Sequence, residues 1–260
     1  MKKSTGYSIK ETVRKHFPLI FTVLKLTNKF QRFSRNSLTI FLWRKFIPKK
    51  NLLIYIGVNR GESLAKLFFK YKKVIAIEAN PELATFLKNR FHKYKYVEIY
   101  NFAASDEDGL AFLKIPNNGN YSASATIDQF ADHRPIKEEY EVEVLKRNLE
   151  LFLLELNIMK IDSYISDCEG MDFIILNSLE KYIQEGRITE IQCEVQRNET
   201  PEAYKSISNK EFLFDNLLEK NYFKVATGWT DLKDGVFNDI PKDWVFFDVK
   251  WRIKKSITFQ

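Results

Sequence analysis

The chain has 260 residues, of which 45% are hydrophobic and 15% aromatic, and its formal net charge is +7. This composition is typical of one sizeable α/β domain with an appendage, and it excludes a disordered chain. The three histidines fall in no motif, which argues against a histidine metal site or a catalytic triad. Cys168 and Cys193 lie in apolar runs, so we expect buried thiols and a cytoplasmic location.

The positive charge is concentrated at the N-terminus. Residues 1–50 contain 13 Lys and Arg and one acid, so the other 210 residues carry a net charge of −5. Basic residues alternate there with Phe, Leu and Ile, which is typical of an amphipathic helix in peripheral contact with an anionic membrane. The alternative is a helical cap that packs on the main domain. No stacking or groove-reading motif accompanies the charge, so we expect no nucleic-acid partner.

We therefore predict three regions. Residues 1–50 form a basic amphipathic helical segment, residues 51–250 form the main domain, and residues 251–260 form a short tail.

The main domain begins with a strand, a glycine turn and a helix. The apolar run 52–56 predicts a buried strand. The turn that follows holds Gly57, Asn59 and Gly61, and it opens a helix predicted over residues 62–71.

A second apolar run, 73–78, ends in Glu78, which lies 21 positions after Gly57. Glycines in such a turn let the backbone approach a ligand, and an acid at this distance can bind both hydroxyls of a ribose. The pattern predicts the nucleoside-binding corner of a doubly wound sheet.

The spacing of the turn selects among nucleosides. Asn59 stands where a dinucleotide site needs its second glycine, which disfavours an NAD-dependent dehydrogenase, and the Gly-Lys-Ser/Thr ending of a phosphate P-loop is absent. A smaller ligand with a charged end, such as S-adenosylmethionine, fits this turn. The alternative is a plain tight connection between strand and helix.

The rest of the chain alternates strands and helices around a loop at 116–139. Further strands are predicted at 97–102, 110–115, 141–145, 163–166, 188–195, 223–226 and 244–249. Further helices are predicted from Pro81 with Asn80 as the cap, at 148–156, from Gly170 to about Glu185, and at 208–219. This order predicts one α/β sandwich in which the last two strands form an antiparallel end.

Four segments, in order, resemble motifs of the FkbM-type S-adenosylmethionine-dependent methyltransferases. Residues 54–63 are similar to the family's Asp-Val-Gly-Ala-Asn-x-Gly turn, and residues 74–81 to its Glu-Pro-Asn-Pro motif. Residues 101–109 resemble its third motif. Residues 167–176 match its Asp-x-Glu-Gly-x-Glu/Asp-x-x-x-Leu element, and Glu194 closes the next strand as the family's acid does.

The resemblance covers roughly residues 50–250. It implies a mostly parallel, seven-stranded Rossmann-like sheet and S-adenosylmethionine as cofactor. The residues it assigns to the cofactor are Gly57, Asn59, Gly61, Ser63, Glu78, Ala79, Asn80 and Ala104.

Two positions depart from the family pattern. The acid of the first motif falls at Tyr55, and the lysine that often precedes the fourth motif falls at Ile165. Tyr55 therefore leaves a second interpretation open, a noncatalytic binding or scaffold module in glycan assembly.

Asp167 and Glu169 are the candidates for acceptor-side catalysis. They lie two apart on an extended segment after a core strand, so each can raise the pKa of the other and make one of them a general base. The alternative is one helix-capping acid and one solvated acid. A divalent cation between them is a further alternative, but two carboxylates without a third oxygen ligand are weak evidence for a cation site, so no metal is assigned.

Together these features predict an O-methyltransferase that acts on a hydroxyl of a sugar, glycan or lipid-linked acceptor. The acceptor class follows from the resemblance and from the lack of nucleic-acid motifs.

Overall fold

The structure is a computed structural model that describes residues 48–116, 125–127, 131, 139–228 and 232–254. The chain divides into two compact units, Met1–Ile47 and Pro48–Gln260, and the described residues all belong to the second. The predicted amphipathic segment therefore lies almost wholly outside the described residues. Among those described, no helix has the length and apolar character to cross a membrane.

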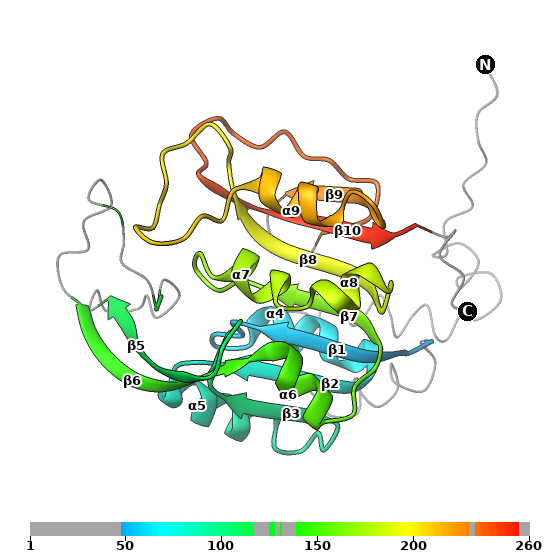
Figure 1. The fold of residues 1–260 in the computed structure, drawn as a ribbon. Helices are drawn as coiled ribbons and strands as arrows, with labels where there is room; N and C mark the ends of the chain where they lie inside the picture. The colour runs from blue at the N-terminus through cyan, green and yellow to red at the C-terminus, as the bar shows by residue number, and fades with distance from the viewer. Residues whose placement is uncertain (1–47, 117–124, 128–130, 132–138, 229–231, 255–260) are drawn as a thin grey trace, which may run out of the picture. The chain divides into compact units, whose positions relative to one another are not determined.

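A seven-stranded sheet forms the centre of the domain, in the order β3-β2-β1-β7-β8-β10-β9 (Figure 1). Its strands are β1 Lys50–Ile56, β2 Tyr71–Glu78, β3 Val97–Asn101, β7 Ile161–Ser166, β8 Ile188–Gln196, β9 Tyr222–Gly228 and β10 Phe246–Ile253. All neighbours are parallel except β10, which is antiparallel to β8 and β9. The predicted doubly wound sheet and its antiparallel end are confirmed.

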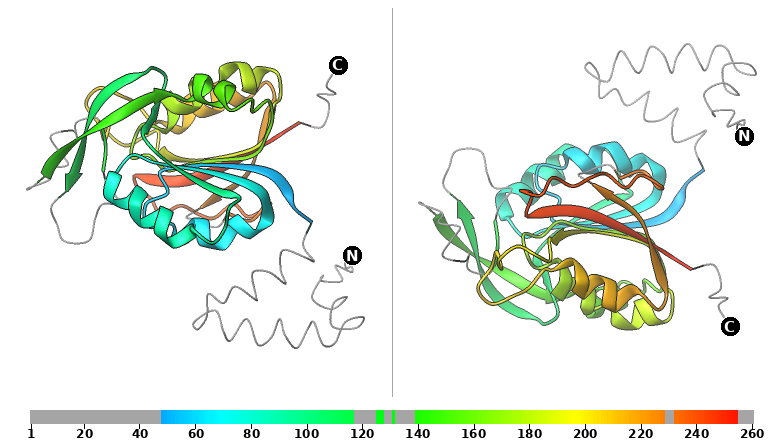
Figure 2. Two further views of the ribbon diagram at one scale, coloured as in Figure 1. Left: turned by 90° about the horizontal axis from the view of Figure 1, so that it is seen from below. Right: turned by 90° about the horizontal axis from the view of Figure 1, so that it is seen from above.

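Helices cover both faces of this sheet. Figure 2 shows α4 (Glu62–Leu67) and α5 (Pro81–Phe91) on one face. The other face carries α6 Leu149–Glu155, α7 Asp172–Asn177, α8 Glu180–Gln184 and α9 Glu211–Leu218. The larger core lies beneath α6 to α9, where alternate residues of β1 (Leu52, Ile54 and Ile56) are buried.

Two predicted helices are shorter than expected. The helix predicted over 62–71 stops at Leu67, where a 3₁₀ turn (Phe68–Lys70) leads directly into β2. The helix predicted to reach Glu185 breaks at Ser178–Leu179 into α7 and α8, and buried Leu179 packs in the core at the break.

A second sheet was missed by the sequence analysis. It has the order β4-β6-β5 and contains Ala103–Ser105, Glu139–Asn148 and Gly109–Pro116. The strand-like runs 110–115 and 141–145 do form strands, but in this sheet rather than in the main sandwich. The reason is the turn at Phe102, after which the chain leaves the main sheet, and a small separate core of Ala103, Leu113, Ile115 and Val144 holds the new sheet together.

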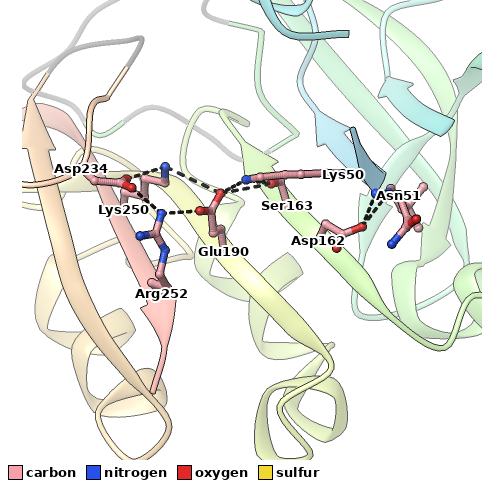
Figure 3. Close-up of polar contacts among 9 residues, drawn as sticks. Lys50, Asn51, Asp162, Ser163, Glu190, Asp234, Lys250 and Arg252 are labelled. Atoms are coloured by element: carbon pink, nitrogen blue, oxygen red, sulfur yellow. Dashed lines mark hydrogen bonds and ion pairs between the residues drawn. The ribbon is translucent and has the colours of Figure 1, made fainter. Parts of the chain in front are cut away.

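An ion network centred on the buried Glu190 joins the first strand of the domain to its last. Glu190 on β8 accepts hydrogen bonds from Lys50 of β1 and Arg252 of β10, and Lys250 lies 3.7 Å away (Figure 3). Asp234 pairs with Lys250 at 2.9 Å and with Arg252. Burial alone raises the pKa of Glu190, but the surrounding cations outweigh it and hold the pKa below its ordinary value.

We expect Glu190→Ala to lower the free energy of unfolding by about 2 kcal/mol or more, because it leaves several cations without their shared partner. Lys73→Ala is the control, since its ion pair with Glu98 (3.1 Å) lies on the surface and should contribute at most about 1 kcal/mol. Urea denaturation measures both. Equal losses in the two variants would contradict the structural role of the network.

Candidate cofactor and acceptor site

A cavity of about 400 Å³ opens at the carboxyl ends of the central strands. The strand order reverses between β1 and β7, which is where open α/β sheets bind ligands. Most polar groups of the lining follow the ends of four strands. The apolar lining includes residues 102–104, the second sheet, α7 and Phe246.

The sheet register explains which residues meet there. Ile56 pairs with Ile77 on one side and with Ser166 on the other, so Gly57, Glu78 and Asp167 follow side by side. Ser166 in turn pairs with Cys193, which places Glu194 beside Asp167. Two of the predicted cofactor residues, Gly57 and Glu78, and the predicted acceptor acid Asp167 thus fall in one row across the sheet.

The glycine turn is shaped by what packs against it. Gly57 has φ 72°, and a Cβ there would lie 1.9 Å from the backbone oxygen of Asp167. Gly61 has φ 71°, and its Cβ would lie 2.6 Å from Leu87 Cδ2 in α5. Gly57 therefore lets β1 and β7 meet at the cavity, whereas Gly61 lets the turn pack on a helix away from it.

Glu78 links the turns after β1 and β2. Its Oε2 accepts a hydrogen bond from the backbone N–H of Asn59 (2.7 Å), and its Oε1 accepts from the N–H of Asn80 (2.9 Å). The side chain is buried yet lines the cavity, and burial raises its pKa while those N–H groups oppose the rise. Each oxygen keeps a lone pair that can accept from a ligand hydroxyl.

Asn59 also lines the cavity, and its side chain has an unsatisfied hydrogen-bond acceptor. Its backbone is left-handed, with φ 52°, and its side-chain Oδ1 is buried without a hydrogen-bond partner. Because buried polar atoms are nearly always hydrogen-bonded, this oxygen fits a donor on a bound ligand.

The eight predicted cofactor residues fall into two groups. Gly57, Asn59, Glu78, Ala79 and Ala104 line the cavity. Gly61, Ser63 and Asn80 do not. Asn80 caps α5, since its Oδ1 accepts from the N–H groups of Glu82 (2.9 Å) and Leu83 (3.4 Å).

Tyr55 stands behind the turn rather than in the cavity. It is 7% exposed and its hydroxyl hydrogen-bonds to Ser63. Burial, with a further contribution from Asp167, raises the pKa of the Tyr55 phenol, so the side chain stays neutral. Tyr55 adds no charge to the cavity and does not fill it.

Both predicted acceptor acids line the cavity. Asp167 continues β7, with its N–H donating to the Ile56 oxygen at 3.2 Å. Glu169 has a left-handed backbone (φ 48°), and two loops hold it: Thr126 donates to its backbone oxygen at 3.0 Å, and the Tyr204 hydroxyl donates to its Oε2 at 3.1 Å. Neither acid caps α7.

Acidic groups gather around Asp167. Its pKa is raised well above the ordinary value by its enclosure in protein and then by the charges of Glu169 and Asp172. The pKa of Glu194 is raised in the same way, by burial and then by Asp167. Below them Asp172 is fully buried and accepts from the Cys168 N–H; burial raises its pKa to about 6.

Some residues of the site carried no signal in the sequence. Thr126, Tyr204 and Phe246 come from loops or from a distant strand end, and only the tertiary structure brings them to Glu169 and the cavity. Glu194 was noted as a motif residue but not assigned to the site.

We expect the domain to become more stable on mild acidification. The folded-state pKa of Asp172 exceeds its unfolded value, so stability is greatest when this group is protonated and falls as pH rises through about 6. Complete protonation of Asp172 should raise the free energy of unfolding by about 3 kcal/mol. About 1 kcal/mol of this gain is expected when the pH falls from roughly 7 to 5. Asp172→Asn should be more stable than wild type at neutral pH and less pH-dependent.

Urea denaturation at each pH tests this, with the exposed-site variant Glu199→Gln as control. A stability that falls between neutral pH and about pH 5 in the wild type would contradict it.

Comparison with known proteins identifies the family to which this chain belongs. Residues 56–223 match the family described as methyltransferase FkbM domain.

Two curated relatives are each named probable ribosomal RNA small subunit methyltransferase A. The protein of Methanosarcina barkeri is 38% identical over 78 residues, 30% of this chain and 27% of its own. That of Methanosphaera stadtmanae is 31% identical over 128 residues, 46% and 47% of the two chains. The chain thus spans less than half of these relatives.

Three solved structures are similar at low identity. An FkbM methyltransferase of Methylobacillus flagellatus has 14% identity and a TM-score of 0.45, covering 77% of this chain and 43% of that one. A putative methyltransferase of Streptococcus mutans in complex with S-adenosylhomocysteine has 9% identity and a TM-score of 0.44, and the match covers 84% of this chain and 97% of that one. M. capricolum TrmK in complex with the same ligand has 13% identity and a TM-score of 0.41, and the match covers 85% of this chain and 70% of that one.

Proposed function

The chain belongs to the FkbM family of S-adenosylmethionine-dependent methyltransferases, and we propose that it methylates a hydroxyl group of a sugar, glycan or lipid-linked acceptor. The observation that most supports this proposal is that the glycine turn and Glu78 line the same cavity as Asp167 and Glu169. A cofactor corner and a pair of candidate bases therefore share one space.

The residues present fit the cofactor. The Oδ1 of Asn59 lacks a donor, which the ammonium of the methionine end would supply, and Gly57 lines the cavity beside it. Glu78 would bind the ribose, and the small side chains of Ala103 and Ala104 would leave space for the adenine. When bound, S-adenosylmethionine supplies an activated methyl group on a sulfonium.

The chain's own contribution to catalysis is then to align the acceptor and take up its proton. Asp167 and Glu169 can accept a hydrogen bond from a hydroxyl in the cavity. The raised pKa of Asp167 makes it a stronger base than an ordinary aspartate, and the bond from Tyr204 fixes the direction of Glu169.

RNA methylation is the second candidate, favoured by the names of the curated relatives. The charge of the cavity opposes it, because carboxylates at its lining repel the phosphates of a nucleic acid. The basic residues of 1–50 are the feature that would support it.

The noncatalytic alternative rests on Tyr55. A module of that kind need not bind the cofactor, so affinity for S-adenosylmethionine separates it from an enzyme.

We expect S-adenosylmethionine to bind the full chain, and Asn59→Gly to weaken binding about tenfold or more, because it removes an acceptor to a charged donor. Glycine tolerates the left-handed backbone at this position, so the turn is preserved. Asn157→Gly is the matched control, since Asn157 has φ 53° on an exposed turn away from the cavity. Isothermal titration calorimetry measures all three proteins; absence of binding to the wild type would favour the noncatalytic module.

We expect Asp167→Asn to reduce methyl transfer about 100-fold or more while changing cofactor affinity little, because it removes the candidate base but keeps its shape. Transfer of labelled methyl groups would be followed with a panel of free sugars, lipid-linked glycans and ribosomal RNA. Labelling of RNA alone would replace the proposed acceptor class with the second candidate.

A further inference from the structure

Three carboxylates converge in the cavity where two were predicted. Asp167 and Glu169 follow β7, and Glu194 comes from β8; one oxygen from each lies within 4.8 Å of the others. A fourth acid, Asp248 on β10, is the direct cross-strand partner of Glu194. Like charges placed opposite one another destabilise a sheet unless a cation compensates them.

Glu194 shows that the compensation is incomplete. Its Oε2 is buried and has no hydrogen-bond partner. Among the residues that the structure describes, no lysine or arginine forms an ion pair with Asp167 or Glu194. A buried carboxylate oxygen without a donor costs free energy, and the neighbouring carboxylates cannot supply a donor while they are ionised.

The same strand provides the contrast. Glu190 lies four residues earlier on the same face of β8, and there Lys50, Lys250 and Arg252 surround it (Figure 3). Around Glu194, near the carboxyl end of β8, the neighbouring charged groups are instead the carboxylates of Asp167, Glu169 and Asp248. The cation missing at Glu194 is therefore one that the described residues do not provide.

We propose that Asp167, Glu169 and Glu194 bind one hard divalent cation, such as Mg²⁺ or Mn²⁺. The donor set consists of carboxylate oxygens alone, which such ions prefer. Glu169 is already oriented by its bond from Tyr204, an arrangement typical of the partners that hold metal ligands in place. Glu194 supplies the third oxygen ligand whose absence led the sequence analysis to assign no metal.

The role of the cation rests on the proposed function, although its binding does not. Because the three ligands lie in the wall of the cavity, the remaining coordination positions face its interior. An acceptor hydroxyl bound there would be oriented by the cation and its pKa lowered. Acceptors with two neighbouring hydroxyls would gain most, since both oxygens can coordinate.

Titration of the full chain with Mn²⁺ tests the site, with free Mn²⁺ measured by electron paramagnetic resonance. We expect the wild type to bind one ion with a Kd below about 1 mM. Glu194→Gln should weaken binding at least about tenfold, while the equally charged exposed-site variant Glu199→Gln should bind like wild type. No binding by the wild type, or unchanged binding by Glu194→Gln, overturns the proposal.

Thermal unfolding provides a second test, because the substitution should not lower stability without metal but should abolish the stabilisation by metal. Without metal, Glu194→Gln should be at least as stable as wild type, because it relieves repulsion with Asp167 and Asp248. Saturating Mg²⁺ should raise the Tm of the wild type but not that of the variant. If Glu194→Gln does not fold, Asp167→Asn provides the same two measurements. Neither uses cofactor or acceptor, so their failure is distinct from failure of the proposed function.

Discussion

The register of the central sheet is the constraint on which the site depends. Pairing of Ile56 with Ile77 and Ser166 brings Glu78, Gly57 and Asp167 into one row at the carboxyl edge, and Glu194 and Asp248 extend that row. A slip of one residue in any of these strands would turn an acid to the opposite face of the sheet. Gly57 is what allows the row to close, because the backbone oxygen of Asp167 occupies the place of a side chain there.

Hydrogen bonds within the protein build much of the cofactor side before any ligand binds. Glu78 accepts N–H groups from the turn after β1 and from the turn after β2, so one buried carboxylate fixes both. Asn80 then starts α5, and Tyr55 with Ser63 supports the first turn from behind. Such preorganisation means that little conformational entropy remains to be lost on binding.

The sequence was informative where the physical signal is local. Continuous apolar runs located β1 and β2, and the Asn80-Pro81 pair located the start of α5, because strand burial and helix capping depend on near neighbours. The sequence was less informative about the direction in which a side chain points, and two residues of the same motif, Gly61 and Ser63, do not line the cavity. Three-residue β4 and the contact of Tyr204 with Glu169 had no local signal.

The distribution of charge along β8 distinguishes Glu190, which stabilises the fold, from Glu194, an acid of the candidate site. Glu190 has a lowered pKa because cations surround it, which is the expected outcome when a buried acid serves stability. Glu194 and Asp167 have raised pKa values because the surrounding protein desolvates them and other carboxylates lie beside them, and this arrangement opposes stability at neutral pH. Groups with pKa values perturbed in this costly direction cluster at functional sites. A cavity that holds them beside a cofactor turn is therefore better explained by the ligand or proton it binds than by the fold it belongs to.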